Sequence, residues 1–90
     1  MLNVVSRNLN EKTKSVIKRG YIPAIIHGYG LEKGIPVEVY KTDFKRLLEV
    51  NGHKGAIELS LNGETKSCVI EEVQIDGVKG EFLHIDFKTC

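Results

Sequence analysis

The sequence has no apolar run long enough to cross a bilayer. Its longest apolar run is five residues, Ile22–Ile26, against the roughly 20 that a membrane-spanning helix needs. The segment Met1–Val5 lacks the charged-then-apolar order of a signal peptide. Cysteine is scarce as well, with only Cys68 and Cys90. We therefore expect a cytoplasmic protein that does not enter a membrane, in which both thiols stay reduced and unpaired and Cys68 serves as a small core residue.

The chain also lacks a strong excess of charge of either sign. Its formal net charge is +1, which argues against a strongly basic nucleic-acid binder. The charges are unevenly placed, however: residues 1–20 carry five basic side chains and one acidic one, whereas residues 51–90 carry four basic and seven acidic ones. One basic patch facing a polyanion would produce this asymmetry, and a solvated lysine-rich helix would produce it about as well.

The sequence contains no recognisable catalytic or metal-binding motif. No nucleophile elbow occurs, and His27, His84 and Asp86 lack the paired spacing of metal ligands. The segment Gly28–Gly30 has neither the lysine nor the spacing of a phosphate-binding loop. We expect no catalytic residue, no protein-bound metal, no cofactor and no small-molecule substrate.

The chain contains enough apolar residues to form one hydrophobic core. Ninety residues with 41 % hydrophobic content predict a single domain over residues 1–90. The run Ile22–Ile26 between glycines predicts a short buried strand that opens at Pro23, because proline cannot donate a ladder hydrogen bond. His27 then lies at the rim, and residues 28–34 are expected to form a loop.

Further strands are predicted over residues 2–5 and 35–40, the latter edge-like because it contains Pro36. A short helix is expected between residues 10 and 20, ending at Gly20. A second helix should begin with Thr42 as its cap and end at residues 51–52, with Phe44, Leu47 and Leu48 on its apolar face.

A hairpin is predicted where the period of the pattern becomes two. Ile57, Leu59 and Leu61 alternate with polar residues, and Asn62-Gly63 supplies the residues of a two-residue type I′ turn. The return strand places Cys68 and Ile70 inward, and Val73 and Ile75 follow in the opposite phase. We therefore expect a bulge near Glu71-Glu72.

The last strand should span residues 81–88, after a turn at Asp76-Gly77. Leu83, Ile85 and Phe87 would face the core, and Phe82, His84, Asp86 and Lys88 the outside. Short strands separated by turn signals, with two short helices, favour a closed or nearly closed antiparallel barrel with helices at its ends.

His84 and Asp86 share the outer face of that strand, and the preceding turn can bring Gln74 alongside them. Spacing alone favours ordinary solvent-facing residues. These residue types nevertheless suit nucleic-acid recognition. Lysine and arginine neutralise phosphates, while Gln, His and Asp can hydrogen-bond base edges or ribose hydroxyls.

Three motifs in this order and spacing resemble one family: Ile22-Pro23-Ala24-Ile25-Ile26-His27-Gly28, Val73-Gln74 with Asp76, and His84-Ile85-Asp86-Phe87. The chain looks over essentially its whole length like the bacterial ribosomal proteins numbered twenty-fifth of the large subunit, also known as general stress protein Ctc. The resemblance implies a mainly β fold with short α-helices, a six-stranded antiparallel β-barrel similar to the anticodon-binding barrels of glutaminyl-tRNA synthetase. It also implies binding to the loop E region of 5S rRNA, through a widened minor groove whose magnesium is held by the RNA.

The resemblance further implies a set of RNA-binding residues. In the basic segment these are Arg7, Lys14, Ser15, Lys18 and Arg19, and on the barrel face they are His27, Gln74, His84 and Asp86. The sequence departs from the family pattern at His27, where tyrosine is usual, and at Asp76-Gly77, where Asp-Pro is usual.

The expected function is that of a structural constituent of the large ribosomal subunit with 5S rRNA as partner, located in the cytoplasm on the ribosome and monomeric outside it. The alternative is a stress-related barrel module whose principal partner is protein and whose RNA binding is weak. The basic segment before Gly20 discriminates between the two.

Overall fold

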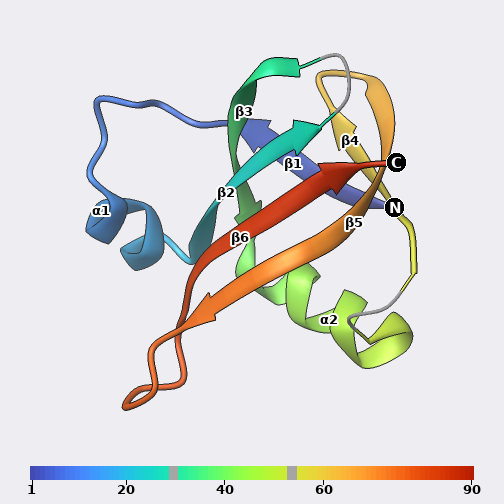
Figure 1. The fold of residues 1–90 in the computed structure, drawn as a ribbon. Coiled ribbons are helices and arrows are strands. Elements are labelled where there is room, and N and C mark those ends of the chain that lie inside the picture. Colours follow the sequence, from blue (N-terminus) through green and yellow to red (C-terminus); the bar gives the residue numbers. More distant parts are fainter. Residues whose placement is uncertain (29–30, 53–54) are drawn as a thin grey trace.

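The computed structural model describes residues 1–28, 31–52 and 55–90. In chain order its elements are β1 (Leu2–Ser6), α1 (Thr13–Lys18), β2 (Tyr21–Gly28), β3 (Leu31–Tyr40), α2 (Lys41–Asn51), β4 (Ile57–Leu61), β5 (Glu64–Ile75) and β6 (Phe82–Thr89) (Figure 1). The strands form a closed barrel in the order β1-β3-β2-β6-β5-β4. The predicted six-stranded barrel with two short helices is confirmed.

The pairing within this barrel is mixed. Four neighbouring pairs are antiparallel, but β1–β4 and β2–β6 are parallel, so the expected all-antiparallel pairing holds for four pairs and fails for two. Hairpin signals report only strands that follow each other in the chain. The parallel pairs join strands that are distant in sequence. They close the barrel, but no turn motif in the sequence indicates that these strands pair.

Strand β2 begins at Tyr21, so the prediction that Pro23 opens the strand is wrong. Pro23 lies opposite Glu38 of β3, whereas pairing with β6 on the other side begins only at Ala24. Because β6 does not yet pair at Pro23, the missing N–H removes no ladder hydrogen bond on that side.

Strand β3 is longer than predicted, because it starts at Leu31 and residues 31–34 are therefore not loop. Gly28 is not loop either, because it is the last residue of β2, and the other predicted loop residues, Tyr29 and Gly30, lie outside the described residues. β3 is also not an edge, since it pairs with both β1 and β2. Its pairing with β1 covers Val37–Val39 only, so Pro36 lies just beyond it. The proline signal thus marked the end of one ladder and not the edge of the sheet.

The β4–β5 hairpin is confirmed. Leu61 pairs with Glu64, and the two loop residues Asn62 and Gly63 have φ values of 52° and 85°. Positive φ at both positions is what a type I′ turn requires.

The β5–β6 ladder contains two irregularities, of which the sequence predicted one. Its register shifts between Ile70 and Glu72, which confirms the bulge at Glu71. A second shift follows between Gln74 and Ile75, where Ile75 pairs with Phe82 and Gln74 with His84, so that Leu83 has no partner.

This second shift overturns two predicted orientations, those of Phe82 and Leu83, and the predicted orientation of Ile75 at the end of β5 is also wrong. Phe82 packs against the core instead of facing outward. Leu83 is displaced from the core face and lines a groove beside α1. Ile75 is 51 % exposed instead of facing inward with Val73.

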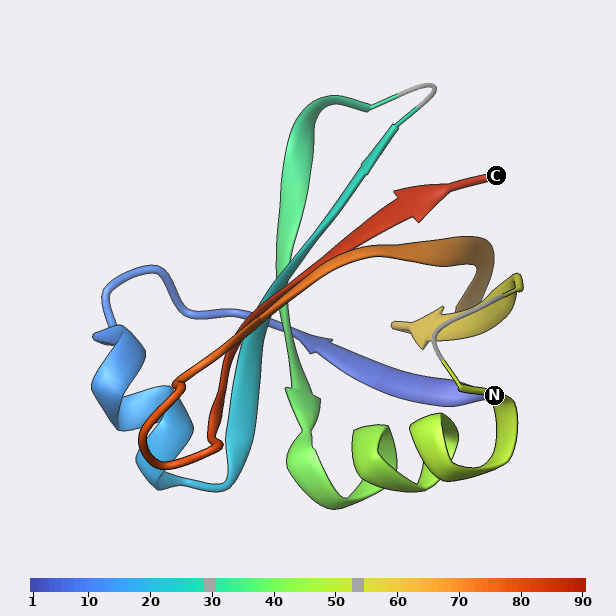
Figure 2. The ribbon, with the colours of Figure 1, turned by 60° about the horizontal axis from the view of Figure 1, so that its bottom comes forward.

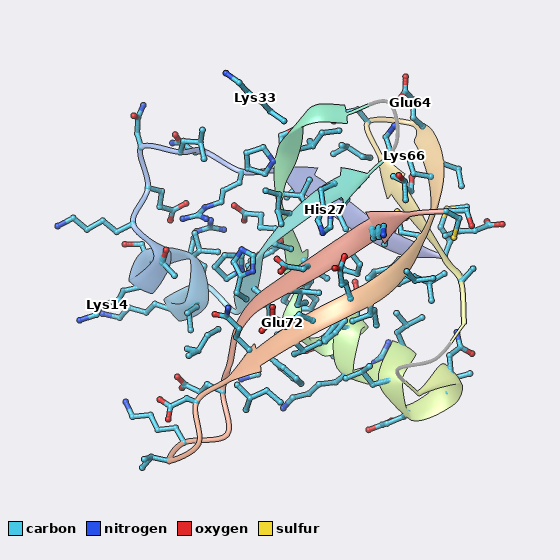
Figure 3. The ribbon with its side chains drawn as sticks, viewed as in Figure 1. Lys14, His27, Lys33, Glu64, Lys66 and Glu72 are labelled. Atoms are coloured by element: carbon cyan, nitrogen blue, oxygen red, sulfur yellow. The ribbon has the colours of Figure 1, made fainter. Side chains whose placement is uncertain are left out.

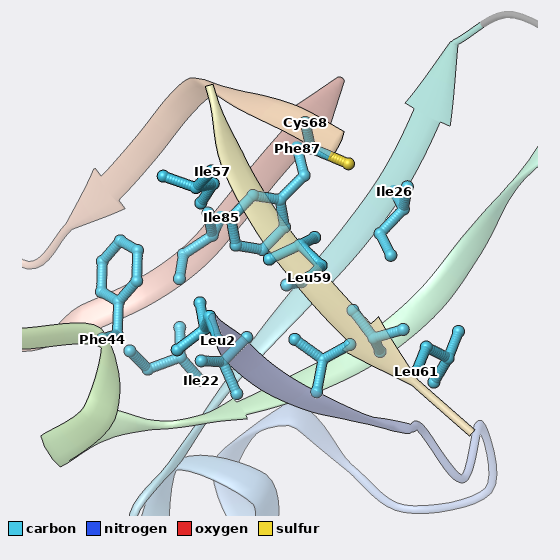
Figure 4. Close-up of a cluster of buried hydrophobic side chains, with 14 residues drawn as sticks. Leu2, Ile22, Ile26, Phe44, Ile57, Leu59, Leu61, Cys68, Ile85 and Phe87 are labelled. Atoms are coloured by element: carbon cyan, nitrogen blue, oxygen red, sulfur yellow. The ribbon is translucent and has the colours of Figure 1, made fainter. Parts of the chain in front are cut away.

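The barrel interior is filled by one cluster of apolar side chains (Figure 4). Its buried members are Leu2, Val4, Ile22, Ala24, Ile26, Val37, Val39, Phe44, Ile57, Leu59, Leu61, Cys68, Ile85 and Phe87. The thiols of Cys68 and Cys90 are free, as predicted, and burial raises the pKa of the Cys68 thiol. Within the described ranges, neither helix is long and apolar enough to cross a membrane.

Helix α2 lies across one end of the barrel, as expected (Figure 2). It begins at Lys41, whose amide donates to the carbonyl of Gly20. The chain passes directly from strand to helix, so Thr42 already lies in the first turn and the prediction that it caps the helix is wrong. Phe44 is fully buried and meets the ring of Phe82 edge-on, with 5.3 Å between ring centroids.

Candidate nucleic-acid interface

Helix α1 presents three predicted RNA contacts to solvent. Lys14, Ser15 and Lys18 are exposed, whereas Val16 on the opposite side is fully buried. Positions 14 and 18 are neighbours on a helix surface because they are four residues apart. Gly20, with a φ of +87°, follows the helix and donates its amide to the carbonyl of Ile17. The predicted glycine end of the helix therefore positions the basic surface next to β2.

Arg7 connects the end of β1 to the start of α1. One terminal nitrogen of its guanidinium donates to Oγ1 of Thr13 at 3.1 Å. Its Nε is buried and has no hydrogen-bond partner within the described part of the chain. Arg7 is half-buried, so it holds α1 to the barrel in addition to any contact with RNA.

Arg19 is occupied by two carboxylates. Its guanidinium donates to Glu11 through Nε at 2.8 Å and through a terminal nitrogen at 2.6 Å, and to Glu38 at 2.9 Å. Its carbon Cζ lies 5.1 Å from the ring centroid of Tyr21, within range of a cation–π contact. The charge of Arg19 is therefore already balanced, and its assignment as an RNA contact stays a prediction.

This arrangement shifts the pKa values of Arg19 and Glu11. The hydrogen bond from Arg19 holds the pKa of Glu11 below its ordinary value, and the two carboxylates raise the pKa of Arg19 further above its own. Glu38 is only 5 % exposed. Sequence reasoning missed it because its alternating strand position gave no sign that an arginine would reach it.

The outer face of β2, β6 and β5 brings the predicted polar contacts together. Gln74 pairs directly with His84 across the β5–β6 ladder, as the sequence predicted. The Nδ1 atom of His84 lies 3.1 Å from Oδ1 of Asp86, and both side chains are about 30 % exposed. These three residues present hydrogen-bonding groups on one continuous surface.

His27 lies on the same outer face, opposite Lys88 of β6. Its Nε2 is 3.1 Å from Oε2 of Glu71, the bulge residue of β5. Figure 3 shows His27 over β2 and Glu72 over β5, with Lys14 on α1 to one side. The face therefore carries three carboxylates, those of Glu71, Glu72 and Asp86, beside the basic surface of α1.

A groove of about 580 Å³ lies between α1 and the loop that joins β5 to β6. It is lined by Lys14, Ile17, Lys18, Asp76, Lys79, Glu81 and Leu83. Sequence reasoning treated residues 76–77 only as a turn and missed Lys79. The only feature of the sequence that pointed to Lys79 was the presence of a lysine between two glycines in a predicted loop.

Comparison with known proteins identifies relatives over most of the chain. The family model described as the Ribosomal L25p family matches residues 2–87. A protein of Thermoanaerobacter sp. (strain X514) is 33 % identical over 88 residues, which cover 97 % of this chain and 44 % of the relative. A protein of Caldicellulosiruptor bescii is 38 % identical over 71 residues, covering 79 % of this chain and 35 % of the relative.

A protein of Halalkalibacterium halodurans is 37 % identical over 76 residues, which cover 83 % of this chain and 35 % of the relative. All three relatives bear the name large ribosomal subunit protein bL25. The chain spans less than half the length of each of them.

Proposed function

From the premise that this chain belongs to the ribosomal L25p family, we propose that it is a structural constituent of the large ribosomal subunit that binds the loop E region of 5S rRNA. The RNA-binding surface consists of α1 and the outer face of β2, β6 and β5. The protein acts in the cytoplasm on the ribosome, is monomeric outside it, and has no catalytic role. It holds no cofactor itself, and the magnesium belongs to the RNA.

The observation that carries this proposal is the adjacency of two kinds of surface. Exposed Lys14 and Lys18 can neutralise phosphates, which supplies affinity without sequence information. Gln74, His84 and Asp86 can donate to or accept from base edges and ribose hydroxyls. Adjacent anchoring and reading surfaces suit an RNA whose minor groove is open, because the minor groove of RNA displays the base edges and 2′-hydroxyls.

Asp86 needs a specific role on such a surface, since phosphates repel its carboxylate. It accepts hydrogen bonds from base amino or imino groups, or it orients His84, whose Nδ1 is 3.1 Å away. In either role Asp86 contributes to the recognition of bases, whereas Lys18 on α1 acts as a point charge against a phosphate.

Two substitutions separate these roles. Lys18→Ala should weaken cognate and non-cognate RNA about equally and lower the slope of log K against log salt by roughly 1. Asp86→Ala should cost about 1 to 3 kcal/mol on cognate RNA and leave the slope nearly unchanged. Titrations of 5S rRNA at several salt concentrations measure both quantities.

Lys45→Ala is the matched control, because Lys45 is exposed on α2, outside the proposed surface. If Asp86→Ala binds cognate RNA as well as the parent protein does, the assignment of the β5–β6 face is wrong.

A further inference from the structure

We propose that the loop joining β5 to β6, residues 76–81, is a second RNA-binding element that faces α1 across the groove, with Lys79 as its phosphate contact. The inference rests on the proposed function and extends the RNA-binding surface to this loop. The RNA backbone lies in the groove, between the lysines of α1 and the lysine of the loop.

The groove has cationic groups on both sides. Lys14 and Lys18 come from α1, and Lys79 comes from the loop. Ile17 and Leu83 supply apolar lining between them. Leu83 reaches the groove because the second register shift leaves it without a partner on β5. The irregularity of the ladder therefore has a consequence at the surface, since it forms part of a groove next to the basic helix.

The loop is held in shape by its own hydrogen bonds. The amide of Asp76 donates to the carbonyl of Glu81 at 2.8 Å, and the amide of Gly80 donates to the carbonyl of Asp76 at 2.7 Å. The Oδ1 atom of Asp76 accepts from the amides of Val78 at 2.8 Å and Lys79 at 3.3 Å. Lys79 is thus fixed at its backbone, which lowers the entropy lost when it binds.

Lysines outnumber carboxylates in the groove. The oxygen Oδ1 of Asp76 is already engaged by two backbone amides, which lower the pKa of Asp76. Together, the groove holds three lysines against the two carboxylates of Asp76 and Glu81. The loop projects from the barrel on the side of α1 (Figures 1 and 2), and its tip residue Val78 is 94 % exposed. An extended anionic chain can therefore reach both walls at once.

A nucleic acid fits this groove better than an acidic peptide, because the groove continues the surface of α1 on which the proposed phosphate contacts already lie. Removing one phosphate contact from a duplex RNA should lower the salt slope by about 0.9. If affinity at 1 M salt is unaffected, this slope change corresponds to a roughly fivefold higher Kd at 0.15 M salt.

The test compares Lys79→Ala with Lys33→Ala in titrations of 5S rRNA at several salt concentrations. Lys33 is an exposed lysine near the start of β3 (Figure 3) and does not line the groove, so it is the matched control. We expect Lys79→Ala to show the fivefold loss and the lower slope, and Lys33→Ala to bind as the parent does. Amine-reactive footprinting of the parent protein should show protection of Lys79 by RNA, together with Lys14 and Lys18.

The outcomes separate the inference from the proposed function. If Lys18→Ala weakens binding while Lys79→Ala does not and Lys79 stays reactive in the complex, the loop is not part of the surface and the proposed function stands. If the parent does not bind 5S rRNA, both are overturned. Protection of Lys79 by polyglutamate but not by RNA assigns the groove to an acidic protein and overturns the inference.

Discussion

Replacing Phe44 with alanine tests the role assigned to α2 as the element that closes one end of the barrel. The side chain is fully buried in the core cluster and meets Phe82 edge-on at 5.3 Å. Truncating a buried phenylalanine to alanine typically costs about 3 to 5 kcal/mol, because apolar contact is lost and a cavity remains. Loss of the aromatic pair places the expected value in the upper half of that range.

This loss is large for a domain of this size. A 90-residue domain has a total stability of roughly 5 to 14 kcal/mol, and each 1 kcal/mol shifts Tm by about 4 to 8 °C. Thermal unfolding should therefore show a Tm at least about 16 °C below that of the parent. The residues of α2 take no part in the proposed RNA surface, so the variant should still bind 5S rRNA in the cold.

Val50→Ala on the same helix is the matched control. Val50 is 83 % exposed, so this variant should lie within about 0.5 kcal/mol of the parent. If Phe44→Ala costs no more than Val50→Ala, α2 does not close the barrel and the description of the core is wrong.

Two further predictions concern turns. Gly63→Val should destabilise the domain by about 1 to 3 kcal/mol, because a β-branched residue is strained at a φ of 85°, and urea unfolding that shows no loss would contradict the type I′ assignment. The amides that donate to Asp76 lower its pKa, so its ionisation contributes stability that is complete above the ordinary aspartate pKa of about 3.9 and is lost as pH falls through the lowered value. Asp76→Asn can still accept these hydrogen bonds but cannot titrate, so stability measured from pH 5 to pH 2 should fall less steeply than in the parent, and an identical pH profile would refute this role.

Features that depend on a few adjacent residues could be predicted from the sequence. Asn62-Gly63 determines its own turn, because few other residues adopt positive φ at two successive positions. The bulge at Glu71 followed from a change of phase within one strand. Gln74 beside His84 followed from the order of two strands joined by a short loop. In each case the information lies within about ten residues.

Features that depend on distant segments could not be predicted. The parallel β1–β4 and β2–β6 pairs join segments that no hairpin signal connects. The second register shift in β5–β6 reversed the expected faces of Phe82 and Leu83, because the alternation of apolar residues fits either register there. These long-range pairings also determine which residues line the groove.

In the candidate site, too, local features could be predicted from the sequence and contacts between distant segments could not. Lys14 and Lys18 were predicted as RNA contacts from the family resemblance, and they lie in a basic segment that is visible in the sequence. The pairing of Arg19 with Glu38 joins α1 to β3 across 19 residues, and no spacing rule indicates it. Lys79 became a candidate only when the fold placed its loop opposite α1.

If this domain binds 5S rRNA through the distorted loop E helix, it must distinguish that helix from a regular RNA duplex. Gel shifts should compare a loop E fragment with a regular RNA duplex of the same length, each with and without magnesium. The loop E fragment should bind tightly and only with magnesium, and the regular duplex should bind much more weakly, because proteins recognise regular double-stranded RNA mostly by its shape and not by its bases. Equal affinity for the two RNAs would contradict recognition of loop E.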